Sequence, residues 1–335
     1  MTMMKVTLVC GGPSSEHEVS INSTKSLYEA IDKSKYEVSV FYITKDLKSV
    51  YFKPEKEVII PDDSSRYRPF MEGVEKYLTK TDLAFLAGIH GEFAEDGKLQ
   101  TILEFYGIHY TGSGPTASAI CMDKFRTALI VNTLEEISLP NTTLIDLKTE
   151  IPVEDLAYPL IFKPNSMGSS VGLHIINSED ELRKHVEEAR KEGKYRYVLL
   201  QEYIKDAMEV TCGCLEDREG NMTLIPPVEI IPNKSAFFDY ASKYDDGGAI
   251  EVSPPKNLDK RVCDIVSELA ANIHTLLGCK TYSRSDFLYK DDTLYYMETN
   301  TLPGMTKNSL FPKESKAIGM SFPQLIDFLI ENAQN

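Results

Sequence analysis

The spacing of apolar segments changes partway along the chain, and this change constrains the fold more than any single motif. In the N-terminal third, apolar and β-branched runs at Lys5–Cys10, Tyr36–Thr44 and Leu83–Ala87 are separated by longer stretches. Those stretches have helical periodicity, with helices expected up to Ile31 and around Leu99–Tyr106. Alternation of strands and helices indicates a parallel, doubly wound sheet.

A Gly/Ser/Pro segment, Thr111–Pro115, is the first predicted domain boundary. A helix is expected from there to about Thr133, and beyond Pro152 apolar runs follow one another in quick succession. This spacing favours antiparallel strands and an α+β arrangement. Strands are predicted at Tyr158–Pro164, Val171–Ile176, Tyr197–Tyr203, Glu209–Glu216, Met222–Ile231, Thr281–Tyr289 and Thr293–Thr299, and helices at about 178–191, 259–277 and 322–332.

The composition argues against several classes of protein. The chain has 51 Asp and Glu against 36 Lys and Arg, a net charge of −15, so nucleic acid is not expected as a partner. Its six cysteines include no C-x-x-C pair, which argues against a zinc ribbon or a thioredoxin-type site. No apolar run approaches the ~20 residues of a membrane span, and Met1–Gly12 has no signal-peptide pattern. We therefore expect a cytoplasmic protein with no membrane partner.

The loop Gly11–Ser20 (GGPSSEHEVS) joins the first strand to the first helix. Its glycines let the backbone approach a ligand, the helix N-terminus favours anions, and Glu16 offers a carboxylate to a ligand ammonium. The spacing fits neither G-x-G-x-x-G nor a Walker A loop, and a solvated turn is the alternative. His90 follows the third strand, at the end of a parallel sheet where ligands bind, although a structural role is common for a lone histidine.

The segment Lys163–Gly172 (KPNSMGSSVG) places a lysine at a strand end, before a Gly/Ser loop. Backbone N–H groups of such a loop wrap phosphates, with the lysine as a point charge. The same letters match G-x-S-x-G, which would make Ser170 the nucleophile of a serine hydrolase with Asp239 and His274. A nucleophile elbow requires a helix after the serine, whereas strand-like residues follow here, so a phosphate loop is favoured.

Two neighbouring strands near the C-terminus carry the third candidate site. Period-two alternation puts Arg284 and Asp286 on one strand face, and Glu298 and Asn300 on one face of the next strand. Such oxygen ligands suit Mg²⁺ when nucleotide phosphates complete its shell, and cross-strand charge pairing with Arg284 is the alternative. In the loop that follows, Gly304 can present a backbone N–H to a reacting oxygen.

The polar, aromatic and Gly-rich segment Phe237–Gly248 reads as a long loop of the kind that forms lids. Within it, Lys243 is a candidate to cap a transferring phosphate, and Tyr244 is a candidate to pack over a small substrate. A solvated aromatic loop is the alternative.

Together, these segments resemble the D-alanine–D-alanine ligase family of ATP-grasp enzymes. The matching strings occur in family order between Gly11 and Pro312: GGPSSEHEVS, HGEFAEDGKLQ, YTGSG with MDK, KPNSMGSSVG, FFDYASKY, SRSDF and METNTLPGMTKNSL. The resemblance implies an ATP-grasp fold, α/β and α+β, in three domains. These are an N-terminal Rossmann-like domain (1–112), a central α+β domain (113–200) and a C-terminal α+β domain (201–335) with a lid at about 233–250, and ATP would lie between the last two.

The implied reaction joins two D-alanine molecules into D-alanyl-D-alanine for peptidoglycan precursor synthesis, releasing ADP and phosphate through an acyl phosphate. The implied cofactors are ATP and two Mg²⁺ ions, with Mn²⁺ as a substitute, and the resemblance suggests a homodimer. D-Ala–D-lactate or D-Ala–D-Ser ligation by the same fold is a close alternative, and Tyr244 favours the dipeptide. A non-catalytic nucleotide-binding protein is disfavoured because the lysine and carboxylate set is intact.

The resemblance also implies roles for single residues. Around the substrates, these are Glu16 for the first ammonium, Ser169 and Tyr244 as a bridge from loop to lid, Arg284 and the Gly304 backbone for the oxyanion, His90, and Ser309 and Leu310 for the second carboxylate. The implied ATP contacts are Lys124, Lys163, Ser169, Glu202, Tyr203, Glu209, Lys243 and Asn300, and the implied metal ligands are Asp286, Glu298 and Asn300. Whether Gln201 or Glu202 faces the adenine base is left open.

Overall fold

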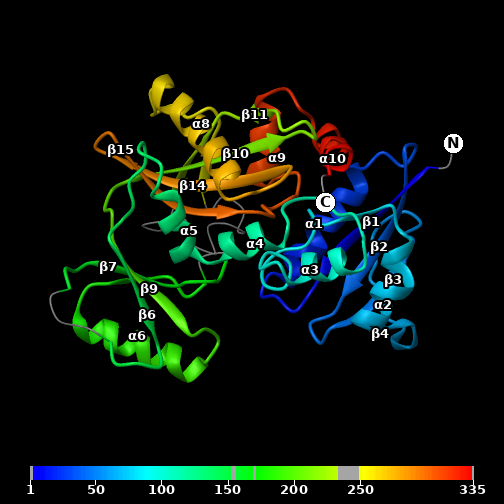
Figure 1. Ribbon diagram of the computed structural model, residues 1–335, viewed down its shortest axis with the longest axis horizontal. Helices are drawn as coiled ribbons and strands as arrows, with labels where there is room; N and C mark the ends of the chain where they lie inside the picture. The colour runs from blue at the N-terminus through cyan, green and yellow to red at the C-terminus, as the bar shows by residue number, and fades with distance from the viewer. Residues whose placement is uncertain (1–2, 152–155, 169–170, 233–248, 334–335) are drawn as a thin grey trace.

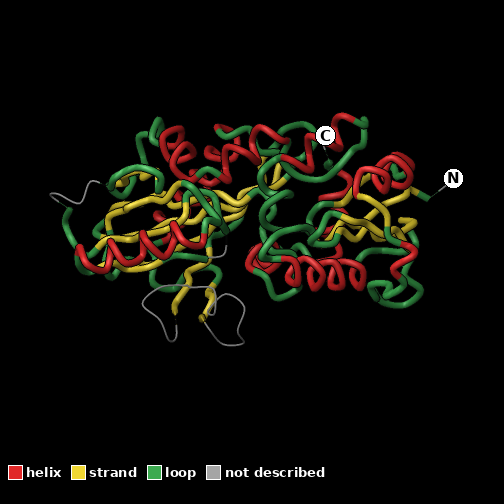
Figure 2. The backbone as a smooth tube through the Cα atoms, turned by 90° about the horizontal axis from the view of Figure 1, so that it is seen from below, coloured by secondary structure: helices red, strands yellow, loops and turns green. Residues whose placement is uncertain are grey.

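Three sheets from successive parts of the chain organise the molecule. The computed structural model describes residues 3–151, 156–168, 171–232 and 249–333. The sheets follow one another from blue through green to orange in Figure 1, and helices flank the strands in both halves of the molecule (Figure 2). This mixture of α/β and α+β parts confirms the expected fold class. Within the described ranges, no helix has the length and apolar character needed to cross a bilayer.

The N-terminal sheet has the strand order β4-β3-β2-β1-β5. Its centre is parallel, as predicted, because β1 (Met4–Gly11) pairs in parallel with β2 (Tyr36–Ile43) and with β5 (Leu83–Phe85). The prediction of a parallel sheet is wrong at the edge, where β3 (Lys48–Phe52) and β4 (Arg68–Pro69) are antiparallel. A tight turn at Leu47, with φ of 56°, folds β3 directly back onto β2. No crossover helix is therefore needed there.

Helices from both ends of the chain complete the core around this sheet. They are α1 (His17–Ala30), α2 (Phe70–Tyr77), α3 (Lys98–Phe105), the short 3₁₀ helix η2 (Leu78–Lys80), and the C-terminal α9 (Leu310–Ala317) and α10 (Phe322–Glu331). A second 3₁₀ helix, η1 (Ser64–Arg66), has no buried residue. Figure 1 shows α10, in red, beside the blue N-terminal elements. Lys35 Nζ lies 2.6 Å from Asp327 Oδ2, which links the first part of the chain to the last helix. The sequence predicted α10 but missed α2 and α9.

The four-stranded sheet has the order β6-β9-β7-β8 and is antiparallel throughout, as expected for this part of the chain. Its strands are β6 (Thr142–Asp146), β7 (Leu160–Pro164), β8 (His174–Ile176) and β9 (Tyr197–Glu202), of which only β6 was not predicted. Helix α6 (Glu179–Glu192) contributes Leu182 and Val186 to the core beneath the sheet. Ser178 caps this helix by accepting the Glu181 N–H at 3.3 Å.

The third sheet has the order β13-β12-β10-β14-β15, with β11 paired to β10. Two adjacent prolines, Pro226 and Pro227, lie between β11 and β12, so the single strand predicted at Met222–Ile231 is wrong. The remaining predicted strands and the long helix are confirmed. The elements are β10 (Met208–Glu216), β11 (Met222–Leu224), β12 (Val228–Pro232), β13 (Ala249–Val252), β14 (Tyr282–Lys290), β15 (Thr293–Asn300) and helix α8 (Lys260–Leu276).

The helix predicted from residue 116 to about 133 is two helices, α4 (Pro115–Met122) and α5 (Lys124–Val131). They are separated at Asp123, whose side chain accepts the Arg126 N–H at 3.0 Å and so caps α5. Both helices pack into the core of the third sheet, where Cys121 and Val131 lie among its buried side chains. The break gives α5 its own N-terminus, and Lys124 is its first residue.

Candidate active site

The paired strands β14 and β15 carry the polar face that the sequence predicted. Arg284 lies opposite Asn300, and Asp286 lies opposite Glu298, so the shared face is confirmed by the register. Arg284 donates to both oxygens of Asp286, at 3.0 Å from Nε and 3.1 Å from Nη2. Thr211 Oγ1 and Asn300 Nδ2 also donate to Asp286. Charge pairing with Arg284 therefore exists within β14, beside the candidate metal ligands.

Lys124 joins this face to the loop that follows β7. Its Nζ lies 3.0 Å from Glu298 Oε2 and donates to the Met167 carbonyl at 2.6 Å. Asn165 holds the first turn of α5 in place, because its carbonyl accepts the Lys124 N–H and its Oδ1 accepts the Phe125 N–H at 2.9 Å. The structure thus brings Lys124, the predicted phosphate loop and a predicted metal ligand together.

A pocket opens between α5, β9 and β15. Its walls are mostly apolar and Lys124 lies at its edge, an arrangement that suits a flat heterocycle with a charged tail. The lining residues are Lys124, Phe125, Ala128, Leu129, Leu139, Pro140, Thr142, Leu199, Gln201, Tyr296 and Met297.

Gln201, rather than Glu202, lines this pocket. Gln201 is buried, its Nε2 donates to Thr142 Oγ1 at 2.9 Å, and its Oε1 has no hydrogen-bond partner in the described part of the chain. Alternation along β9 sends the exposed Glu202 to the other face, where its carboxylate accepts the Asn141 N–H at 3.1 Å. Tyr203 does not line the pocket either. Gln201 therefore lines the pocket and Glu202 does not, and which of the two faces the adenine base stays a prediction.

Two further predicted residues lie on the faces that turn toward these sites. Lys163 is buried in β7 opposite Leu199, and residues paired across antiparallel strands share a face, so it lies on the pocket side of the sheet. Glu209 lies on β10 two residues before Thr211, which contacts Asp286. Period two therefore places Glu209 on the face that carries Asp286.

On the N-terminal side, Glu16 lies between two glycine loops. It precedes α1 and is buried, and a Cβ atom built on either Gly91 or Gly168 would lie 3.1 Å from its Oε2. Gly91 belongs to the loop after β5, and Gly168 to the loop after β7. The first and second candidate segments of the sequence therefore meet at the Glu16 carboxylate.

His90 ties this corner to the loop that follows β15. Its Nε2 pairs with Ser23 Oγ at 2.9 Å and its Nδ1 with the Leu302 carbonyl at 3.1 Å. Burial lowers the pKa of His90, and the nearby Glu16 charge opposes that shift. His90 is therefore a buried side chain held by hydrogen bonds at both ring nitrogens, beside Glu16.

Two carboxyl groups near Arg284, the half-buried Glu95 and the buried Glu314, were missed by the sequence analysis. Burial raises the pKa of Glu95 to about 8, the Glu16 charge adds to this, and Arg284 opposes it. Burial likewise raises the pKa of the fully buried Glu314, on α9, to about 8 against the attraction of Arg284. Glu95 stands in the HGEFAEDG string, which was a usable signal, whereas no local pattern marks Glu314.

The loop from Thr301 to Leu310 is folded tightly on itself. Ser309 Oγ accepts the Thr306 N–H at 3.1 Å and lies 2.9 Å from Thr306 Oγ1. A Cβ atom on Gly304 would lie 3.0 Å from this same oxygen, so only glycine fits without displacement. Leu310 begins α9 directly afterward, so Gly304, Ser309 and Leu310 form one compact unit.

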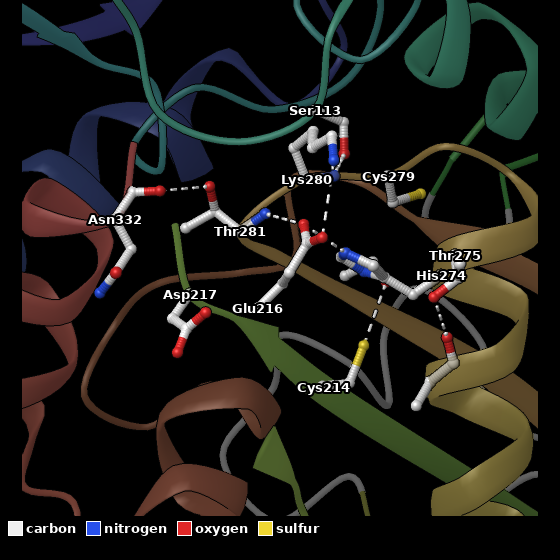
Figure 3. Close-up of polar contacts among 12 residues, drawn as sticks. Ser113, Cys214, Glu216, Asp217, His274, Thr275, Cys279, Lys280, Thr281 and Asn332 are labelled. Carbon is white, nitrogen blue, oxygen red and sulfur yellow. Dashed lines mark hydrogen bonds and ion pairs between the residues drawn. The ribbon is translucent and has the colours of Figure 1, made fainter. Parts of the chain in front are cut away.

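Ser169, Lys243 and Tyr244 lie outside the described residues, as do Ser170 and Asp239 of the hydrolase alternative. The third member of that alternative, His274, is fully buried. Its Nδ1 pairs with Ser283 Oγ at 2.8 Å and its Nε2 lies 3.5 Å from Glu216 Oε2, as Figure 3 shows around Glu216. The hydrolase interpretation is therefore wrong for His274, which is a core residue without access to substrate.

Comparison with known proteins agrees with this geometry. The family description "D-ala D-ala ligase N-terminus" matches residues 5–113, and "D-ala D-ala ligase C-terminus" matches residues 134–331. A D-alanine–D-alanine ligase of Clostridium perfringens (strain SM101 / Type A) is 39% identical, and one of Clostridium botulinum (strain Langeland / NCTC 10281 / Type F) is 36% identical, each over 98% of both chains.

Solved structures give the same result. The VanG D-Ala:D-Ser ligase of Enterococcus faecalis is 30% identical with a TM-score of 0.82, over 98% of this chain and 99% of that one. The D-alanine–D-alanine ligase of Bacillus anthracis complexed with ATP is 31% identical with a TM-score of 0.77, over 99% and 97%. The expected ATP-grasp fold is thereby confirmed. The chain belongs to the D-alanine–D-alanine ligase family.

Proposed function

We propose that this chain joins two D-alanine molecules at the expense of ATP, releasing ADP and phosphate, and so supplies a peptidoglycan precursor. The family membership carries the reaction class. The observation that carries the site is the convergence of Lys124, Glu298 and the loop after β7 beside one pocket. A nucleotide in that pocket would direct its phosphates toward the face that holds Arg284 and Asp286.

On the nucleotide side, the apolar walls would hold the adenine, and the buried Gln201 Oε1 offers it an acceptor. Lys124 and Lys163 would contact phosphates, and Glu209 would face the ribose. Ser169 and Lys243 are assigned to the phosphates by the family resemblance alone. These cations would offset the charge that develops as the γ-phosphoryl group moves to the carboxylate of the first D-alanine.

The chemistry of the donor set fits magnesium. Asp286, Glu298 and the Asn300 amide offer hard oxygen atoms from two adjacent strands. The described residues contain no cluster of three or more His, Cys, Asp or Glu side chains able to hold a metal ion alone, so nucleotide phosphates would have to complete the shell. Two Mg²⁺ ions, or Mn²⁺ in their place, would neutralise phosphate charge there.

On the substrate side, Glu16 would bind the ammonium of the first D-alanine, with His90 fixing the wall beside it. Arg284 and the Gly304 N–H would stabilise the oxyanion that forms when the second amine attacks the acyl phosphate. Ser309 and the start of α9 at Leu310 would bind the carboxylate of the second substrate. Tyr244 and Ser169 would close the site, since water would otherwise hydrolyse the acyl phosphate.

A D-Ala–D-Ser ligase is the second candidate, favoured by the similarity to the VanG structure, and D-lactate is a third choice of acceptor. Tyr244 supports the dipeptide of D-alanine. Mixtures of D-alanine with D-serine or D-lactate, with products identified by mass, distinguish these readings. If the Tyr244→Phe variant leaves the product ratio unchanged, Tyr244 does not determine the second substrate.

We also propose that the chain acts in the cytoplasm, as its sequence leads us to expect, and as a homodimer, as the family resemblance suggests. The direct test of the function is ADP release from Mg²⁺-ATP with D-alanine or L-alanine. Release with D-alanine alone supports the proposal. Turnover with neither amino acid, or with both equally, would remove D-alanine as the substrate.

A further inference from the structure

Two cysteines that are far apart in the sequence meet in the core of the third sheet. Cys121 Sγ, near the end of α4, lies 3.8 Å from Cys279 Sγ, which stands three residues before β14. Both residues are buried, with 5% and 2% of their surface exposed. Neither takes part in the proposed reaction. In the described ranges all six cysteines are free thiols, so this pair is reduced in the structure.

The surroundings of the pair differ for its two members. The Cys121 thiol, followed by the Ser113 and Ser283 hydroxyls, lowers the pKa of Cys279, while burial opposes this. The pKa of Cys121 is raised well above its usual value by its hydrogen bond to Cys279 and by burial. Burial also raises the pKa of the other four thiols, Cys10, Cys212, Cys214 and Cys263. Of the six thiols, Cys279 alone therefore has surroundings that lower its pKa, which favours its thiolate.

Cys279 also lies close to the surface. A Cβ atom built on its neighbour Gly278 would meet no other described residue within 4 Å, apart from its own chain neighbours. Its other neighbour, Lys280, has a side chain that is 42% exposed. Figure 3 shows Cys279 beside Lys280 and Ser113, whose hydroxyl accepts the Lys280 N–H at 3.1 Å. The residues on both sides of Cys279 are therefore open to solvent.

We propose that Cys121 and Cys279 form an oxidisable thiol pair that hydrogen peroxide converts to a disulfide, and that this disulfide weakens nucleotide binding. The pair is a modification site outside the ligation chemistry. Formation of the disulfide does not depend on the proposed function, whereas the effect of the disulfide on ATP binding rests on the nucleotide pocket proposed above.

The chemistry balances with peroxide as the only oxidant. The Cys279 thiolate attacks one peroxide oxygen, an S–O bond forms as the O–O bond breaks, and hydroxide leaves and takes a proton from solvent. The Cys121 sulfur then attacks the Cys279 sulfenic sulfur. An S–S bond forms as the S–O bond breaks, and the departing hydroxyl leaves as water with the Cys121 proton. Two thiols are oxidised and one peroxide is reduced to two waters.

The link to nucleotide binding follows from the position of Cys121. It lies three residues before Lys124, across the break between α4 and α5. A disulfide would shorten the sulfur separation from 3.8 Å to about 2.05 Å. This would draw the end of α4 toward β14, displacing Lys124 from Glu298 and from the Met167 carbonyl.

The test is made on the full chain, first reduced and then treated with hydrogen peroxide. Intact mass and non-reducing peptide mapping should show the loss of about 2 Da and one crosslinked peptide pair containing Cys121 and Cys279. The affinity for ATP, measured by titration calorimetry, should fall roughly tenfold, the equivalent of one charge-assisted hydrogen bond. A reductant such as dithiothreitol should restore both.

Matched variants make the outcome decisive. Cys121→Ser and Cys279→Ser should each abolish the crosslink and the loss of affinity, while Cys263→Ser, at the partly exposed cysteine, should retain both. Oxidation products on Cys263 alone, or a disulfide in another pair, would overturn the site. A Cys121–Cys279 crosslink with unchanged ATP affinity would overturn its effect on binding. If the reduced chain itself fails to bind ATP, the proposed function fails instead, and the crosslink result stands separately.

Discussion

The Lys124 ammonium and a carboxylate oxygen of Glu298 lie 3.0 Å apart, which joins the first turn of α5 to β15. Both side chains are largely buried, 11% and 22% exposed. One is a lysine assigned to nucleotide phosphate, and the other is a carboxylate assigned to magnesium. The two halves of the proposed ATP site are therefore coupled by charge.

Replacing Lys124 by methionine tests this coupling. The variant keeps most of the side-chain volume but removes the charge at the pocket edge and leaves Glu298 without this partner. We expect the KM for ATP to rise roughly 10–100-fold, the equivalent of about 1.5–3 kcal/mol for a charged hydrogen bond. Steady-state ADP release measures it. Lys98→Met, at an exposed lysine paired with Asp96, should leave the KM unchanged.

The Asp286–Arg284 pair predicts a stability difference between two aspartates. Asp286→Asn removes a carboxylate that accepts two bonds from Arg284, so we expect the free energy of unfolding to fall by about 1–3 kcal/mol. Asp146→Asn breaks the more exposed pair with Arg196 and should cost less than ~1 kcal/mol. Urea denaturation of both variants gives the comparison, and equal losses would mean that the Arg284 pair is no better than a surface pair.

Glu314 predicts a pH dependence of stability. Its pKa is raised by burial to about 8, so the native state keeps its proton where the unfolded chain, with a carboxyl pKa near ~4.3, has lost it. The stability that protonated Glu314 contributes is fully present below the unfolded pKa of ~4.3 and is lost as the pH rises toward 8. Relative to the wild type, Glu314→Gln should therefore gain about 2–4 kcal/mol between pH 4.5 and 8. Denaturation at several pH values should show no such gain for Glu72→Gln at an exposed glutamate.

Glu16 predicts a defect confined to the amino acid. Because its carboxylate lies where the loops of Gly91 and Gly168 meet, Glu16→Gln should raise the KM for the first D-alanine roughly tenfold or more. The KM for ATP should change little, since the pocket does not include Glu16. Glu18→Gln, at an exposed glutamate in the first turn of α1, is the control. An equal rise in both KM values would argue against a substrate role for Glu16.

The sequence predicts the parts of this fold in which local pattern and final environment agree. The buried run at Lys5–Cys10 becomes β1, and period two places Asp286 opposite Glu298 on adjacent strands. Asp123 was a usable signal for the break between α4 and α5, since aspartate is a favoured N-cap. The apolar pattern on both sides of it nevertheless favoured one continuous helix. At the edge of the first sheet we expected a crossover to a parallel strand, but the tight turn at Leu47 makes β3 antiparallel to β2 instead.

Local sequence pattern could not predict which residues from distant segments come together. Nothing near Glu314 in the sequence indicates that it lies beside Arg284, and the sequence could not choose between Gln201 and Glu202 for the pocket. Likewise, the spacing of the cysteines along the sequence does not indicate that Cys121 and Cys279 meet. These positions depend on how sheets and helices pack together, and family resemblance supplied the roles that spacing did not.

The acyl phosphate is the central claim of the proposed mechanism, and oxygen isotopes test it most directly. D-alanine labelled with ¹⁸O in its carboxylate is supplied with Mg²⁺-ATP, and the released phosphate is analysed by mass spectrometry. The account predicts that each phosphate carries one labelled oxygen, because the carboxylate oxygen that accepts the γ-phosphoryl group leaves with it. Unlabelled phosphate accompanying ADP and dipeptide would contradict it.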